Sequence, residues 1–165
     1  MNVATQAAVA GAAGAITTNV LHEITRRLTP AAPRVDLLGM QALARGLQSL
    51  GFEAPVGGNL YRLTLAGDIV SNSAYFGLVA RGPRDMALPV GAALGILAGV
   101  GAVVLPQRLG LSATPTERTT LTKALTVLLY TAGGIATGLA FDALDDDHAE
   151  FSEELPDGIS ELRSD

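Results

Sequence analysis

The sequence predicts an all-α integral membrane protein, a bundle of four transmembrane helices with one interfacial amphipathic helix. Apolar residues make up 48% of the 165-residue chain and charged residues only 16%, compared with about 25% in a typical soluble domain. Charge-free runs cover residues 1–21, 86–107 and 124–141, and roughly 20 apolar residues in a helix cross a bilayer core. The alternative, a soluble bundle, would carry polar stripes on its helices, and residues 87–105 have no polar side chain on any face.

Four segments have the length and composition of membrane spans. They lie at about 3–25, 61–80, 86–106 and 121–141. The first is rich in Ala and Gly, and its basic residues follow the apolar run, which favours a retained helix over a cleaved signal peptide. Thr29 and Pro30 end this helix. The second span contains a single charge, Asp68, and the third ends at Pro106.

Two further segments flank these spans. Residues 36–50 place Leu37, Met40, Leu47 and Leu50 on one face of a helix that is too short to cross a bilayer, so we expect it to lie in the interface plane. The alternative is a helix packed against the end of the bundle. Residues 142–165 contain ten acidic residues and one Arg, which predicts a solvated and flexible tail.

The distribution of Lys and Arg predicts the orientation in the cell (plasma) membrane. With four spans, both termini and the turn at 81–85 share one side, which holds Arg81, Arg84 and Arg163. The other side holds Arg26, Arg27, Arg34, Arg45, Arg62, Arg108, Arg118 and Lys123. Because basic loops stay in the cytoplasm, we expect both termini of this multi-pass protein to lie outside.

Composition also excludes several kinds of site. The chain has no Cys, which rules out disulfides, zinc–thiolate sites and iron–sulfur clusters. A net charge of −5 argues against a nucleic-acid partner, which needs a basic face. His22 and Glu23 begin like a zinc-protease motif, but Arg26 stands where the second histidine would be, and a cation does not ligate zinc. The sequence therefore predicts no metal, no cofactor and no complete catalytic site.

Glycines at a spacing of four residues mark helix-packing faces. They are Gly91, Gly95 and Gly99 in the third span and Gly134 and Gly138 in the fourth. Such rows let helix backbones approach closely in lipid. They predict either internal packing of the third span on the fourth or a homo-oligomer interface.

Polar side chains gather instead in the first and second spans. Helical spacing puts two sets on shared faces, namely Asn19, His22, Glu23 and Arg26 in the first span and Asp68, Asn72 and Tyr75 in the second. Since the two spans are antiparallel, His22 and Asp68 are expected at similar depth. A charge inside a membrane costs at least about 2.5–3.5 kcal/mol unless it is paired. The cluster is therefore either a functional site or an ion-paired clamp between helices.

Residues 21–43 (LHEITRRLTPAAPRVDLLGMQAL) and 63–75 (LTLAGDIVSNSAY) resemble a group of small prokaryotic polytopic membrane proteins without assigned activity. The resemblance implies a polytopic membrane protein and assigns no chemistry.

Three functions are compatible with these features. The first is a structural or accessory membrane subunit, whose partners would be the lipid bilayer and either further copies of itself or a larger membrane complex. The second is a small transporter or channel-like protein with an intramembrane polar site around Asp68. The third is a membrane enzyme acting on lipid, which would need an additional acid or nucleophile near the cluster. The sequence favours the first.

Overall fold

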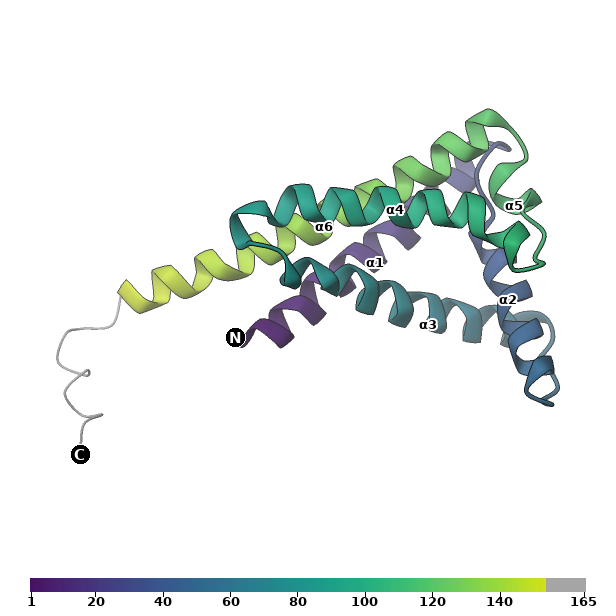
Figure 1. Cartoon of the computed structure of the whole chain (residues 1–165), viewed down its shortest axis with the longest axis horizontal. Coiled ribbons are helices and arrows are strands. Elements are labelled where there is room, and N and C mark those ends of the chain that lie inside the picture. The colour runs from purple at the N-terminus through teal and green to yellow at the C-terminus, as the bar shows by residue number, and fades with distance from the viewer. Residues whose placement is uncertain (154–165) are drawn as a thin grey trace.

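The computed structural model describes residues 1–153, with the side chains of residues 1–144, and within these residues all regular structure is helical. Four long helices, α1 (Val3–Leu28), α3 (Gly57–Phe76), α4 (Ala87–Arg108) and α6 (Thr120–Glu153), extend along the molecule (Figure 1). The shorter α2 (Val35–Ser49) and α5 (Thr114–Glu117) lie at one end, and the 3-10 turns η1 (Gly77–Arg81) and η2 (Arg84–Met86) join α3 to α4 at the other. The prediction of an all-α helical bundle is confirmed.

Only two of the described helices are long and apolar enough to cross a membrane by length and composition. These segments are Arg84–Arg108 and Thr120–Leu144, each of 25 residues, with mean hydropathies of 2.2 and 1.6. The prediction of four spans is thus supported for two. Helices α1 and α3 have 26 and 20 residues, but polar side chains such as His22, Glu23 and Asp68 interrupt their apolar runs.

Local sequence explains where the helices begin and end. Asn2 caps α1, since its side-chain oxygen accepts a hydrogen bond of 2.9 Å from the backbone N–H of Thr5. Thr29 ends the same helix in an extended conformation, which the following Pro30 favours. Gly57 begins α3 with a φ of +58°, a backbone conformation that glycine adopts without steric cost.

Pro106 lies within the last turn of α4 and leaves one carbonyl without a helical donor. Proline has no N–H, so the oxygen of Ala102, four residues earlier, lacks its usual partner. The buried hydroxyl of Thr116 in α5 donates to this oxygen at 2.9 Å. The short helix α5 therefore satisfies a polar group that the proline exposes.

Helices α4 and α6 form the closest pair in the bundle. A Cβ added to Gly91, Gly95 or Gly99 would collide with the α6 backbone, and one added to Gly134 or Gly138 would collide with the α4 backbone. At Gly99, for example, the added Cβ would lie 2.6 Å from the Cα of Val127. All five glycines thus line one contact within the chain.

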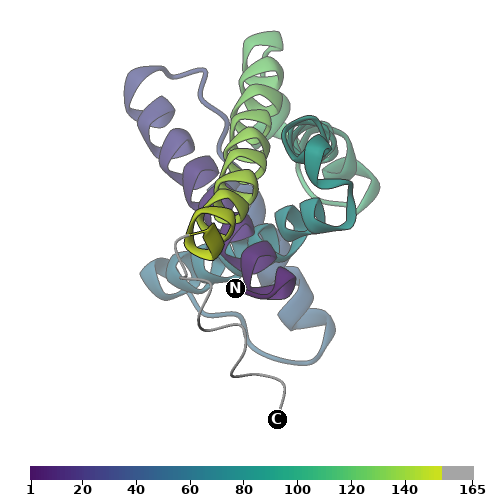
Figure 2. The same cartoon turned by 90° about the vertical axis from the view of Figure 1, so that its left-hand side faces the viewer.

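Helix α1 fits between α3 and α6, again through glycine. A Cβ on Gly11 would collide with the carbonyl oxygen of Ser73 in α3, and one on Gly14 would collide with Thr137 in α6. Figure 2 shows the bundle from its end, with α1 next to α6. Buried threonines lie at these contacts and donate their hydroxyls to the helix carbonyl four residues earlier, as Thr18 does to Gly14 at 2.9 Å.

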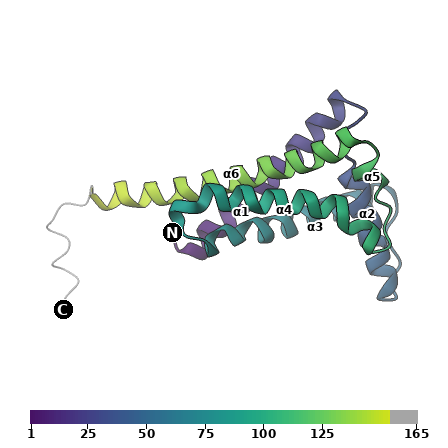
Figure 3. The ribbon, with the colours of Figure 1, turned by 45° about the horizontal axis from the view of Figure 1, so that its top comes forward.

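The two segments outside the expected spans have different outcomes. Helix α2 covers Val35–Ser49, within one residue of the expected bounds, and has no fully buried residue. Helix α6 continues to Glu153, past the end expected at 141, and projects beyond the other helices (Figure 3). Residues 142–153 of the predicted flexible tail are therefore helical, and residues 154–165 lie outside the described part of the chain.

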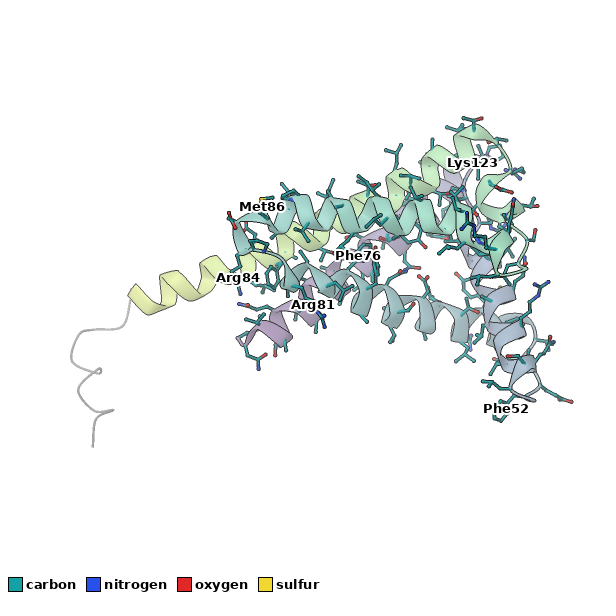
Figure 4. The ribbon with its side chains drawn as sticks, viewed as in Figure 1. Phe52, Phe76, Arg81, Arg84, Met86 and Lys123 are labelled. Atoms are coloured by element: carbon teal, nitrogen blue, oxygen red, sulfur yellow. The ribbon has the colours of Figure 1, made fainter. Side chains whose placement is uncertain are left out.

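The start of α1, the turn before α4 and the later part of α6 meet at one end of the bundle. The side chain of Gln6 donates to the oxygen of Leu144 at 3.1 Å and accepts a hydrogen bond from Arg84. Figure 4 places Arg81, Arg84 and Met86 at this end and Lys123 at the other. Arg81 and Arg84 therefore lie at the end of the bundle that holds the N-terminus, and Lys123 lies at the end that holds α2 and α5.

Candidate functional site

An open cavity of about 590 Å³ lies between α1, α2 and α3. Its walls combine aliphatic side chains with most of the predicted polar cluster. The lining consists of Ile16, Asn19, Val20, His22, Glu23, Ile24, Arg26, Arg27, Pro33, Val35, Asp36, Tyr61, Thr64, Leu65, Asp68 and Ile69. A volume of this size is typical of small-molecule sites, which bury an apolar body and orient it with a few polar groups.

Asp68 is held in this cavity by neutral groups. The side-chain amide of Asn19 donates to its carboxylate oxygen Oδ2 at 2.9 Å, and Asn72 is the other polar neighbour. Within residues 1–144 no Lys, Arg or His forms an ion pair with Asp68. The Asp68 carboxyl group thus joins α1 to α3 by a hydrogen bond and has no cationic partner among these residues.

His22 lines the same cavity and is 93% buried, because only 7% of its surface is exposed. The ring packs edge-on against that of Tyr130 in α6, with centroids 5.5 Å apart and an angle of 70° between the planes. Neither ring nitrogen has a hydrogen-bond partner. Both nitrogens are covered by protein atoms, so the ring would have to turn before its donor and acceptor reached a bound molecule.

A network of ion pairs closes the end of the cavity next to α2. Arg26 pairs with Glu23 and also with Asp36, at 3.2 Å, and Arg27 pairs with Glu23 at 2.8 Å. Arg34 adds a second partner for Asp36 at 2.8 Å. These contacts link the last turn of α1 to the first turn of α2, so the guanidinium groups of Arg26 and Arg27 are already engaged in ion pairs.

The pKa of Asp36 reflects this network. Burial by itself raises the pKa of its carboxyl group, but the hydrogen bonds and charge of Arg34 and the charge of Arg26 more than offset that effect. The backbone N–H of Leu37 contributes in the same direction. The pKa of Asp36 therefore lies below its ordinary value, and the group is ionised at neutral pH.

The structure brings together five of the seven residues in the predicted cluster. Asn19, His22, Glu23, Arg26 and Asp68 line the cavity. The other two, Asn72 and Tyr75, do not line it. Tyr75 instead donates its hydroxyl to the oxygen of Leu94 in α4 at 3.0 Å. Asp68 forms no ion pair with Arg26 or His22, and Arg26 pairs instead with Glu23 and Asp36, so the ion-paired clamp considered as an alternative does not involve Asp68.

Four further residues of the site were not singled out from the sequence. Asp36, Tyr61 and Thr64 line the cavity, and Tyr130 packs on His22. Helical spacing connects residues within one helix only, and α2 was expected to lie apart from the polar cluster. The sequence offered one indication, because Asp36 is an acidic residue at the start of the amphipathic segment 36–50.

Among the described residues, no group of three His, Asp or Glu side chains lies close enough together to hold a metal ion. Outside the ion-pair network, the polar groups that line the cavity are those of Asn19, Tyr61, Thr64 and Asp68 and the buried ring of His22.

Comparison with family models, with curated proteins and with solved structures finds no match to this chain. The comparisons therefore neither support nor contradict the resemblance noted for residues 21–43 and 63–75.

Proposed function

We propose that this chain is an integral membrane protein whose four long helices cross a bilayer and whose cavity around Asp68 binds a ligand, as in a small transporter. The observation that carries this proposal is the uncompensated carboxylate of Asp68 in an open cavity between α1, α2 and α3. An unpaired charge within a membrane is costly and marks a functional site by default.

The surface of α4 supports a membrane environment. Only 17% of its most apolar 18-residue window is buried in the bundle, whereas a central helix of a soluble protein would be mostly buried. Its outward face includes Ile96, Leu97 and Leu105, which are 46%, 63% and 51% exposed. Soluble monomers rarely expose apolar surface of this extent, so lipid is the favoured neighbour.

The other long helices carry apolar outer faces too, which favours four crossings over two. The exposed large apolar side chains include Val9, Ile16 and Val20 on α1, Leu63 and Val70 on α3, and Leu128 and Leu139 on α6. Of the polar side chains that lower the hydropathy of α1 and α3, Asn19, His22, Glu23 and Asp68 line the cavity, whereas Arg62 and Ser71 are exposed outside it. In a membrane protein, polar groups like those in the cavity belong to an internal site.

The basic residues give the proposed orientation. The end with α2 and α5 contains most of the Lys and Arg residues, whereas Arg81 and Arg84 lie at the end with the N-terminus (Figure 4). The positive-inside rule then places α2 in the cytoplasmic interface and both termini outside. The cavity would accordingly lie in the cytoplasmic half of the bilayer.

Cysteine labelling tests the proposal, because the natural chain has no cysteine. Single variants Leu65→Cys in the cavity, Leu97→Cys on the outer face of α4 and Glu53→Cys in an exposed loop would be treated with a charged thiosulfonate reagent in native membranes. We expect Leu65→Cys to react at least about tenfold faster than Leu97→Cys, because the reactive thiolate forms where water reaches the thiol.

Each outcome of this experiment is decisive. Equal, slow labelling of Leu65→Cys and Leu97→Cys would mean that water does not reach the cavity, and the ligand-site proposal would be wrong. Labelling of Leu97→Cys as fast as Glu53→Cys would mean that α4 is not in lipid, and the membrane proposal would be wrong.

The second candidate is a structural or accessory membrane subunit. It is favoured by α6, which runs to Glu153 and projects past the other helices toward the proposed outside (Figure 1). A projecting helix is a natural contact for another protein. Truncation after residue 144 should then reduce the native mass of the complex extracted in mild detergent. An unchanged mass would count against this role.

A further inference from the structure

We infer that the cavity binds a protonated lipophilic amine, with its ammonium group at Asp68 and its apolar body against the aliphatic wall. This inference rests on the proposed function, because it names the class of ligand for the same cavity. Three independent features of the site support it, namely charge, unused hydrogen-bonding groups and the distribution of apolar surface.

The one carboxyl group of the lining without an ionic partner favours a cation. Glu23 and Asp36 also line the cavity, but they are paired with the guanidinium groups of Arg26, Arg27 and Arg34. Asp68 has no ion-pair partner among residues 1–144 and accepts a hydrogen bond from the neutral amide of Asn19. A monovalent cation would supply the missing partner.

The same ion pairs disfavour an anionic ligand such as a phosphate group. Arg26 is shared between Glu23 and Asp36, and Arg27 is bound to Glu23. A phosphate would have to displace these carboxylates before it reached a guanidinium group. The arginines therefore hold α1 to α2 rather than offer an anion site.

The unused hydrogen-bonding groups favour a cation with N–H donors. His22 lines the cavity, is almost fully buried and has no partner on either ring nitrogen. Its unprotonated nitrogen is an acceptor that a turn of the ring would present to the cavity. A primary ammonium group carries three donors, enough for both Asp68 and the turned His22 ring, whereas a quaternary ammonium group has none. Leaving a buried acceptor unpaired costs binding affinity.

The remaining wall suits the apolar part of the ligand. Ile16, Val20 and Ile24 lie one turn apart along α1, and Leu65 and Ile69 face them from α3. The first three are each about half exposed, so the cavity borders the outer face of α1. An amine dissolved in the adjacent bilayer would thus enter sideways with its apolar group first.

Binding of a fluorescent amine tests this inference on the purified full-length protein in detergent. The probe is 1-naphthylmethylamine, and its neutral match of the same size is 1-naphthylmethanol. Naphthyl emission can be followed cleanly because the chain contains no Trp. We expect the wild-type protein to bind the amine at least about tenfold more tightly than the alcohol, because desolvated charge pairs contribute at least that much.

Two variants complete the design. Asp68→Asn keeps the size of the side chain and removes its charge, so amine affinity should fall at least about tenfold while alcohol affinity stays unchanged. Asp85→Asn, in the exposed turn η2 at the opposite end, removes one charge far from the cavity and should change neither affinity. Retained amine affinity in Asp68→Asn would overturn the inference.

The wild-type comparison also decides the matter if Asp68→Asn fails to fold. Equal affinities for amine and alcohol would show that the cavity does not select a cation. Binding of the N,N,N-trimethyl derivative as tight as that of the primary amine would overturn the role of the N–H donors. These failures differ from failure of the proposed function, since Leu65→Cys would still be labelled rapidly if the cavity is hydrated and takes another ligand.

Discussion

Substitution of Gly95 by Ala should separate α4 from α6. The new Cβ would lie 2.5 Å from the carbonyl oxygen of Tyr130 and 2.6 Å from the Cα of Thr131, both backbone atoms of α6. Since ordinary contact begins near 3.4 Å, the two helices must move apart by about 0.9 Å. No side-chain rotation can relieve this collision, because the new Cβ is fixed to the α4 backbone and the atoms that it meets belong to the α6 backbone.

The cost follows from lost packing. A gap of 0.5–1 Å forfeits roughly a quarter to a half of each atom–atom contact, and each contact contributes about 0.1–0.2 kcal/mol. With on the order of 50 atom pairs across the helix contact, the loss is about 3 kcal/mol. Because Ala has a higher helix propensity than Gly, the substitution also stabilises the helix by about 1 kcal/mol. We therefore expect Gly95→Ala to lower the free energy of unfolding by about 2 kcal/mol.

Thermal unfolding in detergent measures this effect, with Gly101→Ala as the matched control. Gly101 lies in the same helix, but its added Cβ would meet only the end of the Leu105 side chain, at 3.4 Å. For a chain of this size, 2 kcal/mol corresponds to a fall in Tm of about 4–8 °C, while Gly101→Ala should leave Tm unchanged or slightly raised. Equal Tm values for the two variants would refute the packing argument.

Three further substitutions test other parts of the structure. Thr116→Val should destabilise the protein by about 1–3 kcal/mol in thermal unfolding, because it leaves the oxygen of Ala102 without a donor. The control Thr114→Val replaces an exposed threonine and should leave the stability unchanged. Equal losses of stability in the two variants would contradict the role of the Thr116 hydroxyl. Tyr75→Phe should cost about 1 kcal/mol by the same assay through its lost hydrogen bond between α3 and α4, and an unchanged Tm would argue against that bond. Because the pKa of Asp36 is lowered in the folded state, its stabilising contribution is present above the ordinary pKa of 3.8 and is lost as pH falls through the lower folded value. The Tm difference between wild type and Asp36→Asn should accordingly shrink below about pH 4, and a constant difference would contradict the ion-pair network.

Much of the helical architecture follows from composition and local signals. The stop at Thr29 and Pro30, the long apolar run of α4 and the break after Pro106 all appear in the sequence as local features. The end of α6 was harder to predict, because acidic residues after 141 suggested a solvated tail, whereas the helix continues to Glu153. Acidic side chains are compatible with a helix as well as with a solvated coil, so composition alone does not separate the two.

Spacing along each helix indicates which residues share a face, but it does not indicate the contacts between helices. It placed Asn19 and His22 on one face of α1 and Asp68 on α3, and these residues do line one cavity. Their partners depend on how the helices pack. Asp68 contacts Asn19, whereas Arg26 pairs with Asp36 of α2.

The sequence by itself determined the helical class, the approximate positions of the long helices and the set of polar residues available to a site, because each of these depends on neighbours within a few turns. The tertiary structure alone decided which charges are paired. Helix α2 packs on α3, and its Asp36 pairs with Arg26 of α1, while Asp68 has no ion-pair partner in the open cavity. Electrostatic pairing depends on distances of a few ångströms between segments far apart in the chain, and no local pattern encodes those distances.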